Sequence, residues 1–156
     1  MRQLHWFQND LRLADNPALE SAQCADSLLC IYLLPKPRAW CNLNGIGPQR
    51  DRFLRESLGE LKAALQGMGQ DLMVLEGSPE LVLPNVVERY AIDRMTTSYA
   101  PGWYEAQAIT FLEEKLPLSL EVFRGDTLFD AAQFPFELEQ LPDTFSPFRR
   151  KVEELP

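Results

Sequence analysis

The residues of this chain that could do chemistry gather in one polar stretch near the amino terminus. The segment His5–Leu19 reads HWFQNDLRLADNPAL, in which an apolar start runs into a long polar segment before Pro17 opens a predicted helix. A connection between a strand and a helix needs only about two to six residues. The extra polar residues therefore indicate either a ligand site or a local network in which Asp10, Arg12 and Asp15 pair with one another and help to cap the next helix.

Nucleophilic, metal and phosphate-loop chemistry find little support elsewhere in the sequence. With one histidine, His5, and no GxSxG sequence, no hydrolase triad can form. Cys24, Cys30 and Cys41 form no CxxC pair, which argues against both a zinc site and a disulfide framework. There is no GxGxxG after the first predicted strand and no GxxxxGK[ST]. We therefore predict no catalytic residue and no metal site in this chain.

The other polar and aromatic candidates have ordinary structural explanations. His5 lies within a predicted central strand, which favours a hydrogen-bonded core histidine. Trp6, Trp40 and Trp103 could stack on a planar ligand, but packing in an α/β core is the commoner role of such residues. Gly45–Gly47 precedes a predicted helix, so a phosphate site at that helix terminus is a minor alternative.

Composition and charge exclude two further classes. No apolar run approaches 18 residues and no charged-then-apolar leader opens the chain, so we expect no membrane segment and a cytoplasmic location. The formal net charge is −8 at pH 7. Because an acidic surface repels a phosphate backbone, we expect no strong DNA binding by this chain alone.

The elements that must position the polar stretch alternate along the chain. Five apolar segments are predicted strands: Arg2–Phe7, Leu28–Leu34, Asp71–Glu76, Ile92–Tyr99 and Leu118–Phe123. Helical segments separate them, and this alternation predicts a parallel sheet with helices on its faces.

The strongest predicted helix is Pro48–Met68, with Pro48 in its first turn and Gly69 after its end. Its apolar face has three- and four-residue spacing and comprises Phe53, Leu54, Ser57, Leu58, Leu61, Ala64, Leu65 and Met68. Three shorter helices are predicted from Asn16 to about Cys24, from a cap at Ser78 to about Tyr90, and from Gly102 to about Leu116. After Phe123 the periodicity ends, and the tail 124–156, which contains four prolines, is predicted to be a connector.

Several phrases of the sequence resemble, in the same order, the DNA photolyase and cryptochrome family. The opening stretch is similar to the family signature WFRxDLRLxDNxAL, with Gln8 in place of the arginine. GPQRDRFLRESLGELKAAL at 47–65 and GQDLMVLEGSPELVLPNVV at 69–87 resemble the second helix and the third strand and helix of the family. RGDTLF at 124–129 and LPDTFSPFRRKVE at 141–153 are similar to the passage that joins two domains in DASH-type cryptochromes.

The resemblance implies a fold and a role. The fold would be a doubly wound, Rossmann-like five-stranded parallel sheet in a three-layer α/β/α arrangement. Residues 1–127 would form the antenna domain, and 128–156 would connect it to a helical FAD-binding domain outside this sequence. Full-length members of the family are blue-light-driven pyrimidine dimer photolyases or signalling proteins, and an antenna chromophore passes excitation to their FAD. The chain would thus harvest light, carry FAD only in a longer form, and be inactive as a lyase by itself.

A ligand of a doubly wound sheet lies beyond the carboxyl ends of the strands, at the point where the strand order reverses. The segments that follow the first, second and fourth predicted strands, 8–15, 35–47 and 100–105, should meet there. This meeting point is a physical reason for a long polar turn after the first strand.

The resemblance also implies the cofactor-binding residues. Glu105 falls where folate-binding photolyases carry the glutamate that holds the pterin, Tyr104 where an asparagine is usual, and Asn44 where some carry a histidine. Phe7 and Gln8 complete the predicted set. The implied cofactor is methenyltetrahydrofolate, because a carboxylate can accept from the adjacent N–H and amine of a pterin, whereas a flavin edge presents carbonyls on both sides of one N–H.

Two other interpretations stay open at this point. The chain could be a free-standing nucleotide-binding domain of the universal-stress-protein kind, although it lacks a glycine-rich loop after the fourth predicted strand. It could also be a structural domain of the same family whose pigment site has decayed.

Overall fold

The structure is a computed structural model that describes residues 1–34, 39–40, 43–127 and 133–153, with only the backbone described at 39–40 and 43–44. The chain divides into two compact units, Met1–Gly125 and Asp126–Pro156, so the division falls two residues before the predicted one. Each unit is described by itself.

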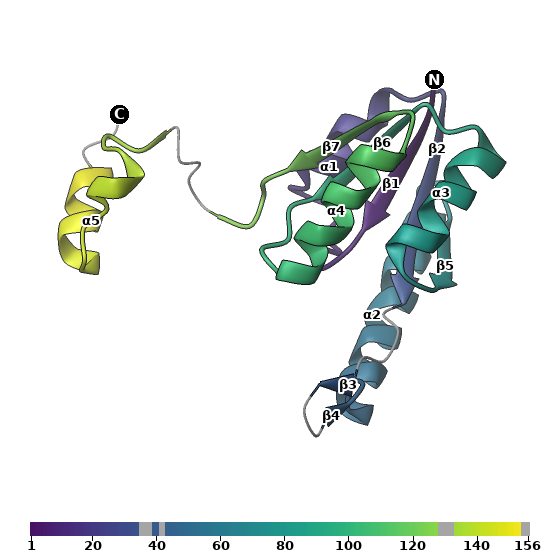
Figure 1. Ribbon diagram of the computed structural model, residues 1–156, viewed down its shortest axis with the longest axis horizontal. Helices are drawn as coiled ribbons and strands as arrows, with labels where there is room; N and C mark the ends of the chain where they lie inside the picture. The colour runs from purple at the N-terminus through teal and green to yellow at the C-terminus, as the bar shows by residue number, and fades with distance from the viewer. Residues whose placement is uncertain (35–38, 41–42, 128–132, 154–156) are drawn as a thin grey trace. The chain divides into compact units, whose positions relative to one another are not determined.

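The first unit is built on a five-stranded sheet in which every pairing is parallel (Figure 1). Its strands, in spatial order, are β5 (Leu72–Glu76), β2 (Ser27–Leu34), β1 (Arg2–Phe7), β6 (Arg94–Ser98) and β7 (Ser119–Phe123). The order turns back at β1, because the chain first adds strands on one side of β1 and then on the other. The predicted doubly wound parallel sheet is confirmed, and the predicted strand ends fall within two residues of the observed ones.

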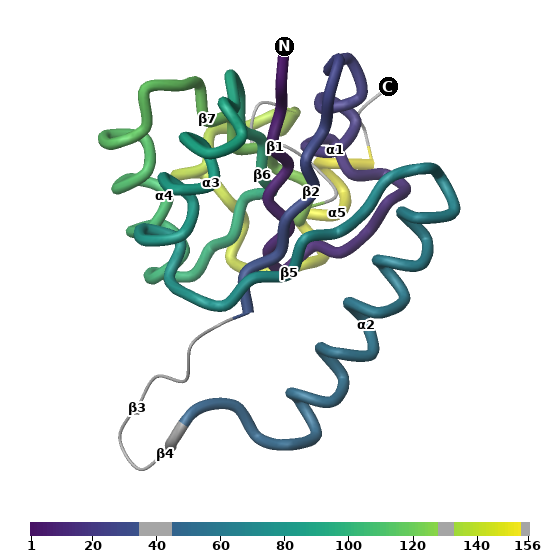
Figure 2. The backbone as a smooth tube through the Cα atoms, turned by 90° about the vertical axis from the view of Figure 1, so that its right-hand side faces the viewer, coloured from purple at the N-terminus to yellow at the C-terminus, as the bar shows by residue number. Residues whose placement is uncertain are grey.

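Helices cover both faces of this sheet. They are α1 (Pro17–Glu20), which continues as the 3-10 turn η1 (Ser21–Cys24), α2 (Pro48–Gly67), α3 (Pro79–Tyr90) and α4 (Trp103–Lys115). Figures 1 and 2 show α3 and α4 on one face and α1 and α2 on the other. The domain therefore has the expected three α/β/α layers.

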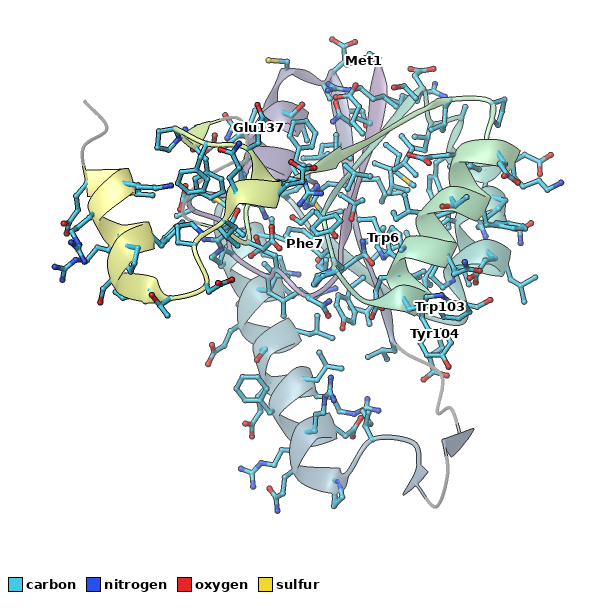
Figure 3. All side chains as sticks on the ribbon, turned by 60° about the vertical axis from the view of Figure 1, so that its left-hand side comes forward. Met1, Trp6, Phe7, Trp103, Tyr104 and Glu137 are labelled. Atoms are coloured by element: carbon cyan, nitrogen blue, oxygen red, sulfur yellow. The ribbon has the colours of Figure 1, made fainter. Side chains whose placement is uncertain are left out.

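Side chains of β1 point alternately to the two faces of the sheet and so contribute to the hydrophobic core on each face. Leu4 and Trp6 belong to the cluster that α3 and α4 cover, whereas Phe7 belongs to the cluster under α2. Figure 3 shows Trp6 and Phe7 extending to opposite sides of the sheet. Because β1 is covered on both faces, its residues from Gln3 to Phe7 are all buried, as a central parallel strand requires.

The N-cap residues predicted for α1 and α3 can be compared with the hydrogen bonds at the start of each helix. The Asn16 side chain accepts a hydrogen bond from the backbone N–H of Leu19 at 3.1 Å, so the predicted start of the first helix is confirmed. The predicted Ser78 cap is wrong, because the Ser78 side chain makes no capping hydrogen bond. The backbone carbonyl of Ser78 instead accepts from the N–H groups of Leu81 and Val82, which leaves its side chain at the surface of a cavity described below.

Helix α2 is longer than the strands it covers. Its 20 residues span about 30 Å, whereas the five residues of the neighbouring β5 span about 17 Å. The buried residues Leu58, Leu61 and Leu65 all lie in its second half, and the first half projects past the sheet (Figures 1 and 2). The prediction that Phe53 belongs to the packed face is therefore wrong, since its side chain is 70% exposed.

Some elements were not predicted. A short antiparallel pair, β3 (Ala39–Trp40) and β4 (Leu43–Asn44), follows β2. The second unit contains a 3-10 turn, η3 (Leu138–Gln140), and a nine-residue helix, α5 (Phe145–Glu153), so the prediction of an aperiodic tail is wrong there. Pro147 does not prevent α5, because it occupies the first turn, where its missing N–H costs no intrahelical bond.

Within the second unit, aromatic contacts hold α5 to the chain before it. Phe134 stacks on Phe136 with ring centroids 5.4 Å apart, and Phe148 of α5 meets Phe134 edge to face at 5.8 Å. Sequence periodicity could not reveal this cluster, because its rings come from a turn and from a helix.

The described part of the chain contains neither a membrane-spanning helix nor a cluster of metal-ligating side chains. No helix there is both long and apolar enough to cross a lipid bilayer. In the same residues no group of three or more His, Cys, Asp and Glu side chains could hold a metal ion.

The predicted core histidine is confirmed. His5 is 1% exposed, and its Nδ1 lies 3.1 Å from the hydroxyl oxygen of Thr96 on β6. Burial lowers the pKa of His5 from its ordinary 6.5 to about 4, against a smaller opposing effect of the nearby Asp10 charge. The folded domain therefore holds this imidazole neutral at pH values where the unfolded chain protonates it.

We expect this histidine to make the domain lose stability in weak acid. Between pH 6.5 and 4 the imidazole is protonated in the unfolded chain but stays neutral in the folded domain. The free energy of unfolding therefore falls as pH falls, by about 3 kcal/mol in total from this group. His5→Asn removes the titration while keeping a polar partner for Thr96. Urea unfolding at several pH values should give a smaller slope over this window for His5→Asn than for the wild type, and equal slopes would contradict the assignment.

Candidate functional site

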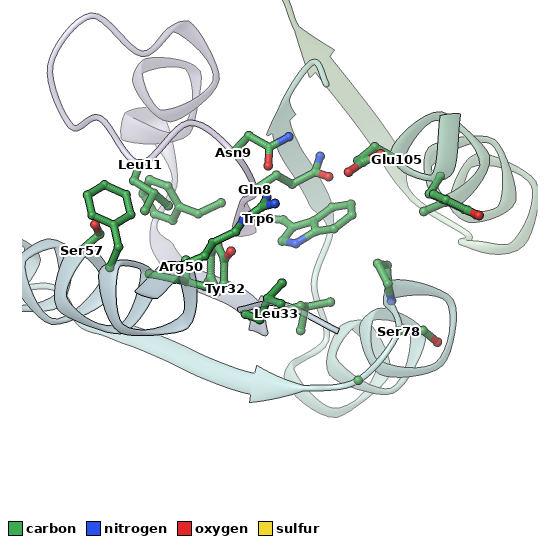
Figure 4. Close-up of a pocket in the computed structure, with 18 of the residues that line it drawn as sticks. Trp6, Gln8, Asn9, Leu11, Tyr32, Leu33, Arg50, Ser57, Ser78 and Glu105 are labelled. Carbon is green, nitrogen blue, oxygen red and sulfur yellow. The ribbon is translucent and has the colours of Figure 1, made fainter. Parts of the chain in front are cut away.

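A cavity of about 750 Å³ opens at the carboxyl edge of the sheet, where the chain segments that follow the paired strands β1 and β6 leave toward opposite faces (Figure 4). Its floor is the end of β1 and β2, including Trp6 and Tyr32. One wall is the projecting half of α2, and the other walls are the first turns of α3 and α4. The cavity lies at the position expected for the ligand of a doubly wound sheet.

Four of the five predicted cofactor-binding residues line this cavity together: Phe7, Gln8, Tyr104 and Glu105. The side chain of the fifth, Asn44, lies outside the described part of the structure, although Gly45 and Ile46 beside it line the cavity. The structure therefore brings together residues from the end of β1, the start of α4 and the segment before α2, as the sequence order predicts.

Gln8 is the first residue after β1 and is held by β6. Its carboxamide Nε2 donates to the hydroxyl of Thr97 at 2.9 Å and approaches the backbone carbonyl of Ser98 at 3.4 Å. The Thr97 hydroxyl in turn donates to the backbone carbonyl of Trp6 at 2.8 Å. Because Thr97 is fully buried, this chain of hydrogen bonds fixes Gln8 at the cavity surface.

Glu105 lies in the first turn of α4 and is half buried. Its carboxylate folds back over Gly102, the N-cap residue, so closely that a Cβ atom at position 102 would overlap it. Among the described residues no group donates a hydrogen bond to this carboxylate. The glutamate therefore presents two acceptor oxygens at the helix N-terminus, where the helix dipole favours negative charge.

Several residues of the α2 wall and the floor were missed by the sequence interpretation, among them Tyr32, Arg50 and Phe53. Burial raises the pKa of Tyr32, and the charge of the nearby Arg50 opposes that rise. Arg50 is exposed in the first turn of α2, and within the described residues no carboxylate pairs with it. The difference in length between α2 and the strands was the signal that could have placed these residues beyond the sheet edge.

The tryptophans have different environments. Trp6 is buried in the core and also lines the cavity, whereas Trp103 is 67% exposed beside Tyr104, with ring centroids 5.0 Å apart (Figure 3). Core packing is therefore right for Trp6 and wrong for Trp103. The side chain of Trp40 is outside the described part of the chain.

The rest of the polar stretch has a structural role. The Arg12 guanidinium forms a two-point ion pair with Asp10, with both N–O distances 2.9 Å, and donates to the carbonyl of Gly125 at 3.0 Å. Partial burial by itself would raise the pKa of the Asp10 carboxyl, but the hydrogen bonds and charge of Arg12 hold that pKa below its ordinary value. The predicted pairing is confirmed for Asp10, Arg12 and, at 3.5 Å, Asp15. The stretch thus divides into a start that faces the cavity and an end with a structural role.

Comparison with known proteins gives consistent matches over nearly the whole chain. A family model described as DNA photolyase matches residues 3–156. The chain is 37% identical over 154 residues to a cryptochrome DASH of Idiomarina loihiensis and 33% identical over 159 residues to the blue-light photoreceptor PHR2 of Arabidopsis thaliana, and each match covers 96% of this chain. The crystal structure of a Synechocystis cryptochrome matches with a TM-score of 0.88 and 27% identity, over 99% of this chain.

The same matches cover only part of each relative. The alignments include 34% of the Idiomarina protein, 35% of the Arabidopsis protein and 34% of the Synechocystis chain. The chain therefore spans about a third of the length of the relatives it matches.

One glycine of the cavity wall should contribute to the stability of the domain. Gly77, between β5 and α3, has φ +144°, and a Cβ atom there would lie 2.5 Å from a methyl carbon of Val82. We expect Gly77→Ala to lower the free energy of unfolding by about 1–3 kcal/mol, because both the backbone and the contact are strained. Gly59→Ala, in open space in the middle of α2, is the matched control and should raise it by about 0.5–1 kcal/mol. Denaturant midpoints that shift equally for both variants would contradict this account.

Proposed function

Because this chain belongs to the DNA photolyase family and forms the N-terminal α/β domain of a photolyase or cryptochrome, we propose that it binds a light-harvesting chromophore in the cavity at the carboxyl edge of its sheet. The observation that carries the proposal is the meeting of Phe7, Gln8, Tyr104 and Glu105 in one cavity. Its volume of about 750 Å³ lies within the usual range of small-molecule sites, about 300–1,000 Å³.

The chemistry of the walls supports a reduced folate as the chromophore. At one end the Glu105 carboxylate offers paired acceptors for the N–H and amine of a pterin. On the α2 wall, Arg50 and the orphan N–H groups after Gly47 can attract the carboxylates of a folate tail. Trp6, Phe7 and Tyr104 provide the aromatic surface that a planar ring requires.

The role of the bound pigment would be physical rather than chemical. A reduced folate would absorb light and pass the excitation to FAD in a longer form of the protein, with no bond changed in this domain. Repair of pyrimidine dimers or blue-light signalling would belong to that longer form, together with its FAD-binding helical domain. In this proposal the present chain binds and orients the antenna.

We expect Glu105→Gln to weaken the binding of methenyltetrahydrofolate by tenfold or more. The change replaces one acceptor oxygen with a donor, and a charge-assisted hydrogen bond contributes about 1.5–3 kcal/mol. Absorbance titration of the wild type, Glu105→Gln and the exposed control Glu113→Gln measures the effect, with melting temperatures recorded for each. If Glu105 only complements the helix dipole, its replacement will lower the melting temperature slightly and leave affinity unchanged. Absence of any pigment binding to the wild type would favour a decayed site.

We expect weak, salt-sensitive binding of this chain to duplex DNA. A net charge of −8 opposes the release of counterions that dominates non-specific affinity. Fluorescence anisotropy with a labelled duplex at two salt concentrations tests the expectation, and tight binding at physiological salt would contradict it.

A further inference from the structure

The hydrogen bonds of Gln8 determine which end of its carboxamide faces the cavity. The Thr97 hydroxyl has one proton, which it donates to the carbonyl of Trp6, so toward Gln8 it can only accept. The backbone carbonyl of Ser98 can only accept as well. The Gln8 atom that lies between these two acceptors must therefore be the nitrogen, and the assignment of the amide follows from chemistry alone.

With its nitrogen engaged by Thr97 and Ser98, Gln8 has only its oxygen left for a ligand. No described residue donates a hydrogen bond to this Oε1. Gln8 is half buried and lines the cavity, so the oxygen is a fixed acceptor at the cavity surface. Its position depends on Thr97, a buried side chain that does not itself line the cavity.

A second acceptor group faces the same region. Figure 4 shows the carboxamide of Gln8 and the carboxylate of Glu105 extending toward each other from the end of β1 and from α4. The missing side chain of Gly102 leaves the space in which the Glu105 carboxylate lies. Two acceptors with no donor between them among the described residues favour a ligand edge that carries adjacent N–H groups.

We propose that Gln8 is a specificity-determining residue of the cavity, and that its fixed oxygen, together with Glu105, selects a 2-amino-4-oxo ring edge over a dioxo edge. This inference rests on the proposed antenna function and deepens it. A ring with a carbonyl in place of the amine would place an oxygen against an oxygen, and a buried acceptor without a donor is costly. Flavins carry such a carbonyl and are rejected for the same reason.

The resemblance described from the sequence sharpens the role of this residue. Where this chain has Gln8, the family signature has an arginine, which carries five N–H donors and no acceptor. The glutamine of this chain therefore offers the cavity an acceptor where an arginine would offer only donors.

Pterin-6-carboxylate and lumazine-6-carboxylate are a suitable pair of probes, because they differ only in the amine or carbonyl at position 2. For the wild-type chain we expect the dissociation constant of the pterin to be about tenfold lower or more. Gln8→Met, which keeps the size of the side chain but removes the acceptor, should reduce this preference to about threefold or less, and Thr97→Val should reduce it by releasing Gln8. Gln107→Met, the same change at an exposed position of α4 away from the cavity, should keep the wild-type preference.

Fluorescence titration of each variant gives the two constants, and melting temperatures show that each variant folds. Equal affinity of the wild type for the two probes, or an unchanged preference in Gln8→Met, would overturn the role of Gln8 and leave the antenna proposal standing. Tighter binding of FMN than of methenyltetrahydrofolate would also overturn it. If the wild type binds none of these four ligands, the proposed function fails, and the inference fails with it.

Discussion

The pairing of β1 between β2 and β6 is the constraint on which the rest of the structure depends. Both pairings are parallel, so the three strands end at one edge, and the chain leaves that edge toward opposite faces of the sheet. The helices that follow β2 and β6 lie in different layers, so the chain segments that connect these strands to their helices separate at this edge. The cavity is the space left by that separation. Its floor is the same strand whose burial on both faces holds the two cores together.

The residue that follows this strand both continues the contact between strands and lines the cavity. Gln8 is the first position beyond the central strand, and its hydrogen bond to Thr97 continues the contact of β1 with β6 after the ladder ends. A few residues later, Arg12 connects Asp10 with the carbonyl of Gly125, which ties the turn to the end of the first unit. One polar connection therefore orients a cavity-lining side chain at its start and closes the domain at its end.

Secondary structure was predicted best where the hydrophobic periodicity agrees with residues that start or end an element. The five strands, the long helix that begins at Pro48 and the Asn16 cap are all local signals, and the structure confirms them. Prediction was weaker wherever the answer depends on relative length or on side-chain rotamers. Phe53 has helical spacing like Leu58 but lies beyond the sheet, and Ser78 is a residue type that often caps helices although its side chain makes no capping hydrogen bond. The acceptor role of Gln8 could not be predicted, because it depends on the proton of Thr97 on a strand 89 residues away.

The half of α2 that projects beyond the sheet sets the depth of the cavity, whereas the other half contributes most of the packing that stabilises the domain. The fully buried residues of α2 begin at Leu58, and before them Leu54 is partly buried against the same core, so most of the first half of the helix forms a wall rather than part of the core. Each added or deleted turn would move the rim of that wall by about 5.4 Å while leaving Leu58, Leu61 and Leu65 in register with the strands. The depth of the cavity can therefore change through the length of a single helix, with the central sheet unchanged.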